Sequence, residues 1–149
     1  MTNPYEFVPR SPRPRGPLTP EELQARLERF GDLAGDVVPD STRSRRLQHY
    51  GSQLTRCSSS AGAAYAEARS ATSTREFEHK LHDCAKELRE SATWLNRITY
   101  VTKQPLLELR DECDQLIAIL TSSICTVGKH PKSPPSRNAD PKKSPRPRR

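Results

Sequence analysis

Residues 51–76, GSQLTRCSSSAGAAYAEARSATSTRE, decide the fold of this chain. In and around this stretch the apolar side chains recur in steps of three and four, which is the spacing of one face of an α-helix. This face consists of Leu47, Tyr50, Leu54, Cys57, Ala61, Ala64 and Ala68. After Leu54 most of its residues are small, so the helix can approach its neighbours to about 8 Å. We therefore predict a closely packed helix from about Thr42 to about Ser70.

Three further helices are predicted from their caps and apolar faces. Thr19-Pro20-Glu21-Glu22 supplies an N-cap hydroxyl, a proline at the first helical position and a capping-box glutamate, and Ser73-Thr74-Arg75-Glu76 forms a second capping box. A last helix is expected from about Pro105 to a glycine C-cap at Gly128. The three apolar faces consist of Leu23, Leu27, Phe30, Ala34 and Val37; of Phe77, Leu81, Cys84, Leu88, Ala92, Leu95 and Ile98; and of Leu106, Leu109, Cys113, Leu116, Leu120 and Ile124. No segment alternates with period two, so the prediction is an all-α fold, an antiparallel up-down four-helix bundle over residues 20–128.

The positive charge is concentrated at the two ends of the chain. Residues 1–19 hold three Arg and one Glu, and residues 129–149 hold eight Lys or Arg and one Asp, whereas residues 20–128 hold fourteen basic and sixteen acidic residues. The ends are also rich in proline and poor in apolar residues, so we predict disordered basic tails over 1–19 and 129–149. The N-terminal residues lack the apolar run of a secretory signal, and the longest strongly apolar run, Leu116–Leu120, is far too short to cross a membrane. We expect a soluble cytoplasmic protein that makes no membrane contact.

The sequence offers little support for catalysis or metal binding. The four cysteines, Cys57, Cys84, Cys113 and Cys125, lie on or beside apolar faces without a CxxC spacing, so buried reduced thiols are expected. His79 and His82 have helical spacing and can chelate a metal. Only two ligands are evident there, however, and a solvated surface is the favoured interpretation. No nucleophile with an ordered base is found, so we expect a protein that is not an enzyme and that has no cofactor.

Arginines supply the main candidate site residues. Arg56, beside the small-residue face, can pair with Glu67 or Glu90, or can cross a subunit boundary. Arg43, Arg45 and Arg46 oppose the helix dipole at the start of their helix and can meet phosphates instead, although a solvated basic face is the simpler interpretation. The basic residues of the C-terminal tail are stronger candidates for nucleic-acid binding, because phosphate neutralisation needs no fold. These tail residues are Lys132, Arg137, Lys142, Lys143, Arg146, Arg148 and Arg149.

Four pieces of the chain, in order, resemble the four-helix bundle family that includes proteins encoded within intervening sequences of bacterial 23S ribosomal RNA genes. The pieces are Gln53-Leu54-Thr55-Arg56 with Ser60, Ala61-Gly62-Ala63 and Glu67-Ala68; Ser73–Phe77; Lys86-Glu87-Leu88-Arg89-Glu90 with Trp94-Leu95; and Asp111-Glu112-Cys113 with Ile119–Ser122. The resemblance covers about residues 20–127. One departure is Ala64, where many members of the family have Asn, so helix register must depend on packing here.

The resemblance implies a non-enzymatic bundle that assembles into a ring-like homopentamer. In such an assembly Gln53, Arg56, Ser60 and Glu67 would serve a contact between subunits. A fold relative, the accessory variability determinant of diversity-generating retroelements, is also pentameric and binds nucleic acid and a reverse transcriptase. The leading prediction is therefore a homo-oligomeric scaffold that associates with RNA or DNA through its basic tails. The alternatives are an adaptor for a reverse transcriptase and a metal-binding or enzymatic bundle that uses His79 and His82.

Overall fold

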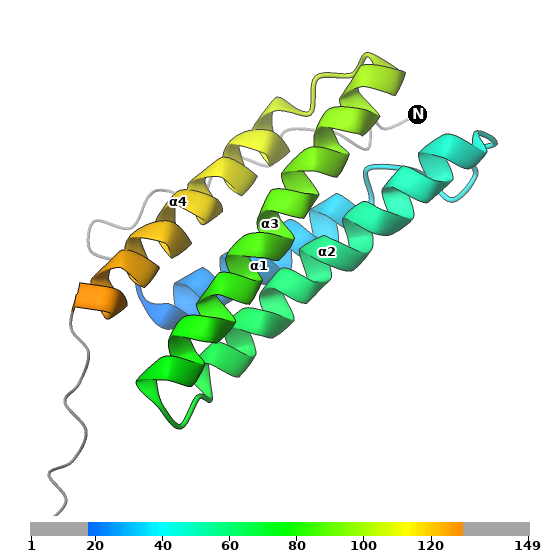
Figure 1. Ribbon diagram of the computed structural model, residues 1–149. Coiled ribbons are helices and arrows are strands. Elements are labelled where there is room, and N and C mark those ends of the chain that lie inside the picture. The colour runs from blue at the N-terminus through cyan, green and yellow to red at the C-terminus, as the bar shows by residue number, and fades with distance from the viewer. Residues whose placement is uncertain (1–17, 130–149) are drawn as a thin grey trace, which may run out of the picture.

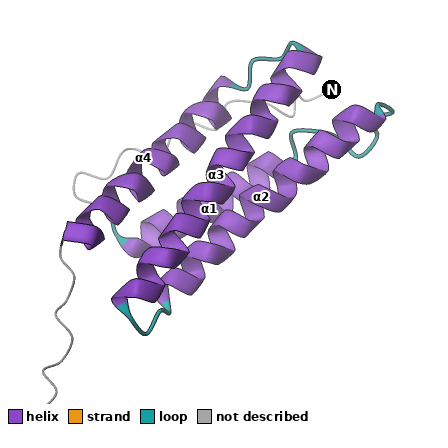
Figure 2. Cartoon of the chain, in the orientation of Figure 1, coloured by secondary structure: helices purple, strands orange, loops and turns teal. Residues whose placement is uncertain are grey.

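The computed structural model describes residues 18–129, which form four helices. They are α1 (Pro20–Gly35), α2 (Arg45–Arg69), α3 (Thr74–Thr102) and α4 (Leu107–Lys129) (Figure 1). Within 18–129 there is no strand, and short loops join the helices (Figure 2). The predicted all-α fold is confirmed, and each predicted helix is present. The predicted disorder of the two tails falls almost wholly outside the described residues.

The four helices pack as an antiparallel up-down bundle. Successive helices run in opposite directions (Figure 1). Helix α1 packs against α2 and α4, and α3 packs against the same two helices on the other side. The bundle is therefore closed by the contact between its first and last helices, as short connections between antiparallel neighbours favour. None of the helices among residues 18–129 is long and apolar enough to cross a membrane.

The predicted helix starts are confirmed in position, with one difference in detail. Thr19 forms the full capping box, because its N–H donates to the Glu22 carboxylate at 2.8 Å and its hydroxyl accepts from the Glu22 N–H at 3.2 Å. The Ser73 hydroxyl accepts from the Glu76 N–H at 3.1 Å, but the Glu76 carboxylate accepts from the N–H and the hydroxyl of Thr72, both at 2.9 Å. The second capping box is therefore only half formed, since the glutamate caps the preceding residue.

Two predicted boundaries shift. Helix α2 begins at Arg45 after the N-cap Ser44, whose hydroxyl accepts from the Leu47 N–H at 3.4 Å. Gly128 was expected to end the last helix, but α4 continues through Gly128 to Lys129, and no glycine among the described residues has a positive φ. Gly128 is thus an ordinary helical residue, and the glycine C-cap predicted there is wrong.

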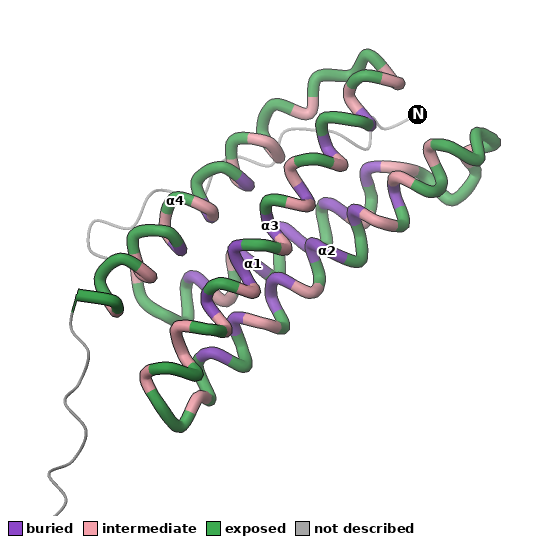
Figure 3. Tube along the Cα trace, in the orientation of Figure 1, coloured by how far each residue is buried: buried purple, intermediate pink, exposed green. Residues whose placement is uncertain are grey.

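Buried residues line the inner faces of all four helices (Figure 3). In α2 the predicted face supplies Leu54, Cys57, Ala61 and Ala68 to the core, and Tyr65 joins them. Helix α2 also buries Gly51, Ser58 and Gly62 on a second face. This second face lies close to α1, because a Cβ placed at Gly31 of α1 would lie 3.6 Å from the Ser58 carbonyl oxygen. The close approach expected of α2 to a neighbouring helix is therefore present.

Three of the four cysteines are buried, as predicted, and one is not. Cys57, Cys84 and Cys113 are buried free thiols, whereas Cys125 is exposed. Burial raises the pKa of Cys84 and of Cys113 to about 12, so both stay protonated at neutral pH. The prediction for Cys125 is wrong because this residue follows the buried Leu120 by five positions, which turns its side chain about 140° around α4.

Candidate nucleic-acid interface

The start of α2 presents three arginines to solvent. Arg43 precedes the N-cap Ser44, and Arg45 and Arg46 form the first turn of α2. All three are exposed, and none forms an ion pair with another described residue. The first turn of α2 contains no acidic residue. The structure therefore places these guanidinium groups in solvent around the start of α2, and their contact with phosphates stays a prediction.

One turn further along, four side chains from two helices form what we call the aromatic cluster: His49, Tyr50, Trp94 and Arg97. The Trp94 ring of α3 lies 5.5 Å from the Tyr50 ring and 5.8 Å, edge-on, from the His49 ring of α2. The Arg97 guanidinium lies 5.1 Å from the centre of the Trp94 ring and 5.9 Å from that of Tyr50. These distances are those of aromatic pairs and of cation–π contacts.

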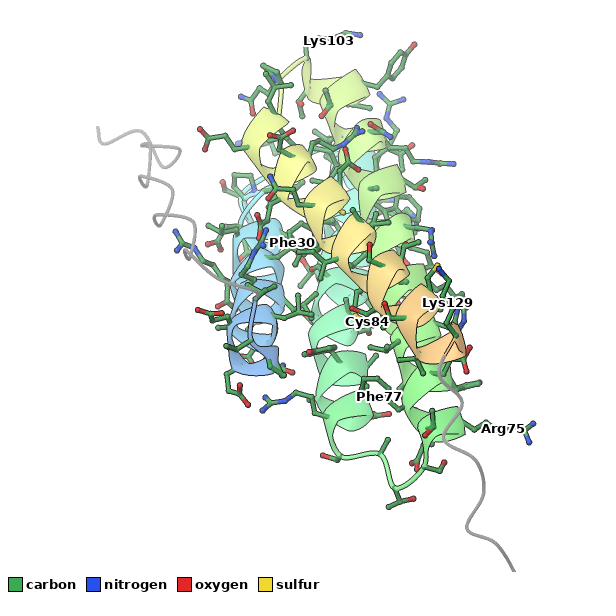
Figure 4. All side chains as sticks on the ribbon, turned by 90° about the vertical axis from the view of Figure 1, so that its left-hand side faces the viewer. Phe30, Arg75, Phe77, Cys84, Lys103 and Lys129 are labelled. Atoms are coloured by element: carbon green, nitrogen blue, oxygen red, sulfur yellow. The ribbon has the colours of Figure 1, made fainter. Side chains whose placement is uncertain are left out.

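A second cation–aromatic pair lies at the end of α3. The Lys103 ammonium is 4.3 Å from the centre of the Tyr100 ring, which is 74% exposed. Lys103 caps α3 in the left-handed conformation, at φ 59°, and donates its N–H to the Thr99 carbonyl at 2.8 Å. Figure 4 shows Lys103 and Arg75 at opposite ends of the bundle. Lys103 therefore adds a positive charge to the end of α3 that lies beside the start of α2.

The charge of the bundle is unevenly distributed. Residues 41–57 and 91–107 contain six Lys or Arg and no Asp or Glu, whereas the rest of residues 20–128 contains eight basic and sixteen acidic residues. Because α2 and α3 are antiparallel and packed together, these two segments lie side by side, and we call them the basic half of the α2–α3 pair. The slightly negative total for residues 20–128 thus conceals a region with an excess of positive charge.

Three of the four polar residues predicted for a subunit contact have partners inside the chain. Arg56 pairs with Glu90 at 3.3 Å, one of the partners expected, and its Nε donates to Gln53 at 3.3 Å. Glu67 pairs instead with Lys80, at 2.5 Å. Ser60 is half-buried on the same helix. These contacts neither require nor exclude a second copy, so the subunit contact stays a prediction.

The structure adds no further ligand to the histidine pair. His79 Nδ1 lies 3.3 Å from an Asp83 carboxylate oxygen, and His82 is exposed. Among residues 18–129, no group of three or more His, Cys, Asp or Glu is placed to hold a metal ion. The predicted C-terminal binding residues Lys132, Arg137, Lys142, Lys143, Arg146, Arg148 and Arg149 lie outside the described residues.

Sequence reasoning missed the aromatic cluster as a site. In the sequence, Trp94 stands out only beside Leu95 in a family-like segment, and no pattern singles out His49. One signal was nevertheless available, since the two acid-free segments can be read directly from the sequence. To predict that these two segments lie side by side, however, one must know the register between α2 and α3, which only the structure provides.

The sequence pattern of the 23S rRNA-intervening sequence protein family matches residues 32–122. The match begins in the last turn of α1, includes α2 and α3, and ends in the second half of α4. No curated protein and no solved structure matches the chain.

Proposed function

Because this chain belongs to the 23S rRNA-intervening sequence protein family, we propose that it is a non-catalytic, homo-oligomeric scaffold that associates with nucleic acid. The bundle provides the assembling unit, and basic segments provide weak contacts to phosphates. When several copies assemble, such contacts act together through effective concentration and become strong without any new contact.

The observation that carries this proposal is the distribution of charge. The basic half of the α2–α3 pair holds Arg43, Arg45 and Arg46 without acidic neighbours in its two segments. Residues 130–149 add seven Lys or Arg against one Asp. Each phosphate that such residues neutralise releases counterions and steepens the dependence of binding on salt. Two separate basic regions therefore support polyanion binding, one on the bundle and one in the C-terminal segment.

The test compares the salt dependence of nucleic-acid binding for the whole chain and for the chain without residues 130–149. The slope of log K against log salt should become shallower by several units, because each lost phosphate contact removes about 0.7 to 0.9. A full-length variant with the seven tail Lys and Arg changed to Gln separates the loss of charge from the loss of chain length. If both shortened and neutralised chains bind with the original slope, the tail contributes nothing.

The surface of α4 supports the self-association in this proposal. Helix α4 contributes only three buried residues and borders an open hollow of about 570 Å³ lined by Ala118, Ile119, Ser122, Ser123, Thr126 and Val127. This is surface that a second copy can cover. Light scattering behind a sizing column should give the mass of several chains, with a pentamer as the expected state. A monomer at all concentrations would rule out both the ring and the cooperation between copies.

A further inference from the structure

We propose that the aromatic cluster binds the unpaired bases of single-stranded nucleic acid, while Arg43, Arg45 and Arg46 hold phosphates of the same strand. This inference rests on the proposed function and deepens it, because it assigns a site on the bundle and a class of nucleic acid. It does not involve the C-terminal segment.

The rings of the cluster are held in place and yet remain accessible. Tyr50 and Trp94 are half-buried and pack against the core, and His49 is exposed. A ring held by the core loses little conformational freedom when a ligand stacks on it. Each base has an aromatic face, so stacking on such rings tolerates any sequence. The cluster is therefore a preorganised surface for bases.

Arg97 extends this surface. Its guanidinium lies over two rings, at 5.1 Å from Trp94 and 5.9 Å from Tyr50, and the side chain is exposed. Unpaired bases stack on arginine planes as well as on aromatic rings. Arg97 also brings a positive charge to the cluster, and no Asp or Glu occurs in residues 91–107 around it. Arg97 can thus contact a base with its planar face and the phosphate of that nucleotide with its charge.

The phosphate contacts lie one helical turn away. Arg45 and Arg46 precede His49 and Tyr50 by four residues each, which places each arginine about 6 Å along the axis on the same side of α2. In a duplex the bases are stacked on one another and unavailable to rings on a convex helix surface. The arrangement therefore favours an unpaired strand over a duplex, whereas charge alone would bind both.

The chain contains a direct reporter of this contact, because Trp94 is its only tryptophan. A base that stacks on Trp94 should quench its fluorescence, whereas phosphate contacts elsewhere should not. We would titrate the full chain with an unstructured single-stranded RNA of about 15 nucleotides, with single-stranded DNA of the same sequence, and with the corresponding duplex. The expected result is quenching by a single strand and binding without quenching by the duplex. The RNA and DNA arms show which strand is preferred.

Two variants keep the reporter and remove its neighbours. Tyr50→Leu retains apolar packing but removes a ring, and Arg97→Ala removes the stacked guanidinium. Each should weaken single-strand binding by about fivefold or more, since one stacked base accounts for roughly that factor. Tyr50→Leu should leave duplex binding unchanged, whereas Arg97→Ala also removes a positive charge and should weaken duplex binding by less than it weakens single-strand binding. The matched control is Arg75→Ala, which removes an exposed arginine at the opposite end of α3 (Figure 4) and should change neither. Circular dichroism checks that each variant keeps its helices.

The outcomes separate this inference from the proposed function. Single strands and duplex that bind alike without quenching would overturn the inference and leave the proposed function standing. Variants that bind single strands as tightly as the unaltered chain would also overturn it. If the chain lacking residues 130–149 still shows quenching by a single strand but loses the duplex, the cluster is an independent site. Failure of every nucleic acid to bind would overturn both proposals.

Discussion

Burial divides the four cysteines into two chemical classes. Cys57 donates to the Leu54 carbonyl and Cys113 to the Leu88 carbonyl, both inside the core, and Cys84 is also fully buried. Because the thiolate is the reactive form, a buried thiol with a raised pKa is inert. Cys125 alone is exposed among them.

We therefore predict one fast-reacting thiol per folded chain. With a thiol-specific reagent at about pH 8, near the ordinary thiol pKa, Cys125 should react at once, while Cys57, Cys84 and Cys113 should react only as the chain unfolds. Cys125→Ser should abolish the fast phase and leave the slow phase intact, which assigns the phases. Two or more fast thiols in the unaltered protein would show that the core opens more readily than the packing indicates.

At the scale of the element, α2 was predicted well along one face and incompletely along another. The predicted face was confirmed because its Leu, Cys and Ala residues meet the core. A helix in a bundle has two neighbours, however, and α2 packs against α1 as well as α3. The face toward α1 consists of Gly51, Ser58 and Gly62, which an apolar pattern does not register because glycine and serine are not apolar.

The helix caps and the candidate site show which features could be predicted from the sequence. Contacts between residues close together in the chain could be predicted, and contacts between two helices could not. Thr19 and Glu22 are three residues apart, so their capping box could be read from the chain. The positions of Arg43, Arg45 and Arg46 could be read for the same reason. The contact between Tyr50 and Trp94 joins two helices whose register depends on the packing of both, so it could not.

The close packing beside Gly51 allows a direct test. A Cβ at this position would lie 2.8 Å from the Val38 Cβ, in the connection between α1 and α2. Overpacking costs about 1–3 kcal/mol, whereas alanine gains about 1 kcal/mol over glycine within a helix. Gly51→Ala should therefore lower the free energy of unfolding by about 1 kcal/mol, measured by urea denaturation.

Two variants complete this test. At Gly128 a Cβ would meet, among residues 18–129, only a Glu78 carboxylate oxygen at 3.8 Å, so Gly128→Ala should be neutral or stabilising. Val38→Gly in the Gly51→Ala background removes the Val38 Cβ together with both methyl groups and so removes the clash, and the double variant should lose less than the two single variants together. Strict additivity would show that Val38 is not the obstacle.

At the scale of the whole molecule, one ion pair spans the contact that closes the bundle. Arg26 of α1 donates from two nitrogens to the two carboxylate oxygens of Glu112 in α4, each at 2.8 Å. Their side chains are 30% and 31% exposed, so water screens the pair only partly. The hydrogen bonds to Glu112 raise the pKa of Arg26, and the guanidinium stays charged. Bidentate pairs of this kind are among the stronger polar contacts.

Glu112→Gln should consequently destabilise the bundle by about 1–2 kcal/mol, because one partner of a half-buried pair is lost. The matched control is Glu21→Gln, which breaks the pair between Glu21 and Arg69. Glu21 is 71% exposed there, and the expected loss is below about 0.5 kcal/mol. Denaturant titrations of both variants give the comparison, and equal losses would contradict a special role for the α1–α4 pair.

The basic half of the α2–α3 pair and the acidic remainder of the bundle also give the molecule an electric dipole. A dipolar molecule turns in the field of a polyanion before contact, so it arrives with its positive side forward and associates faster than its net charge alone would allow. The same dipole lets the positive side of one copy attract the negative side of the next. At low ionic strength, where the Debye length reaches about 30 Å, copies would attract one another head to tail, and added salt would weaken that attraction.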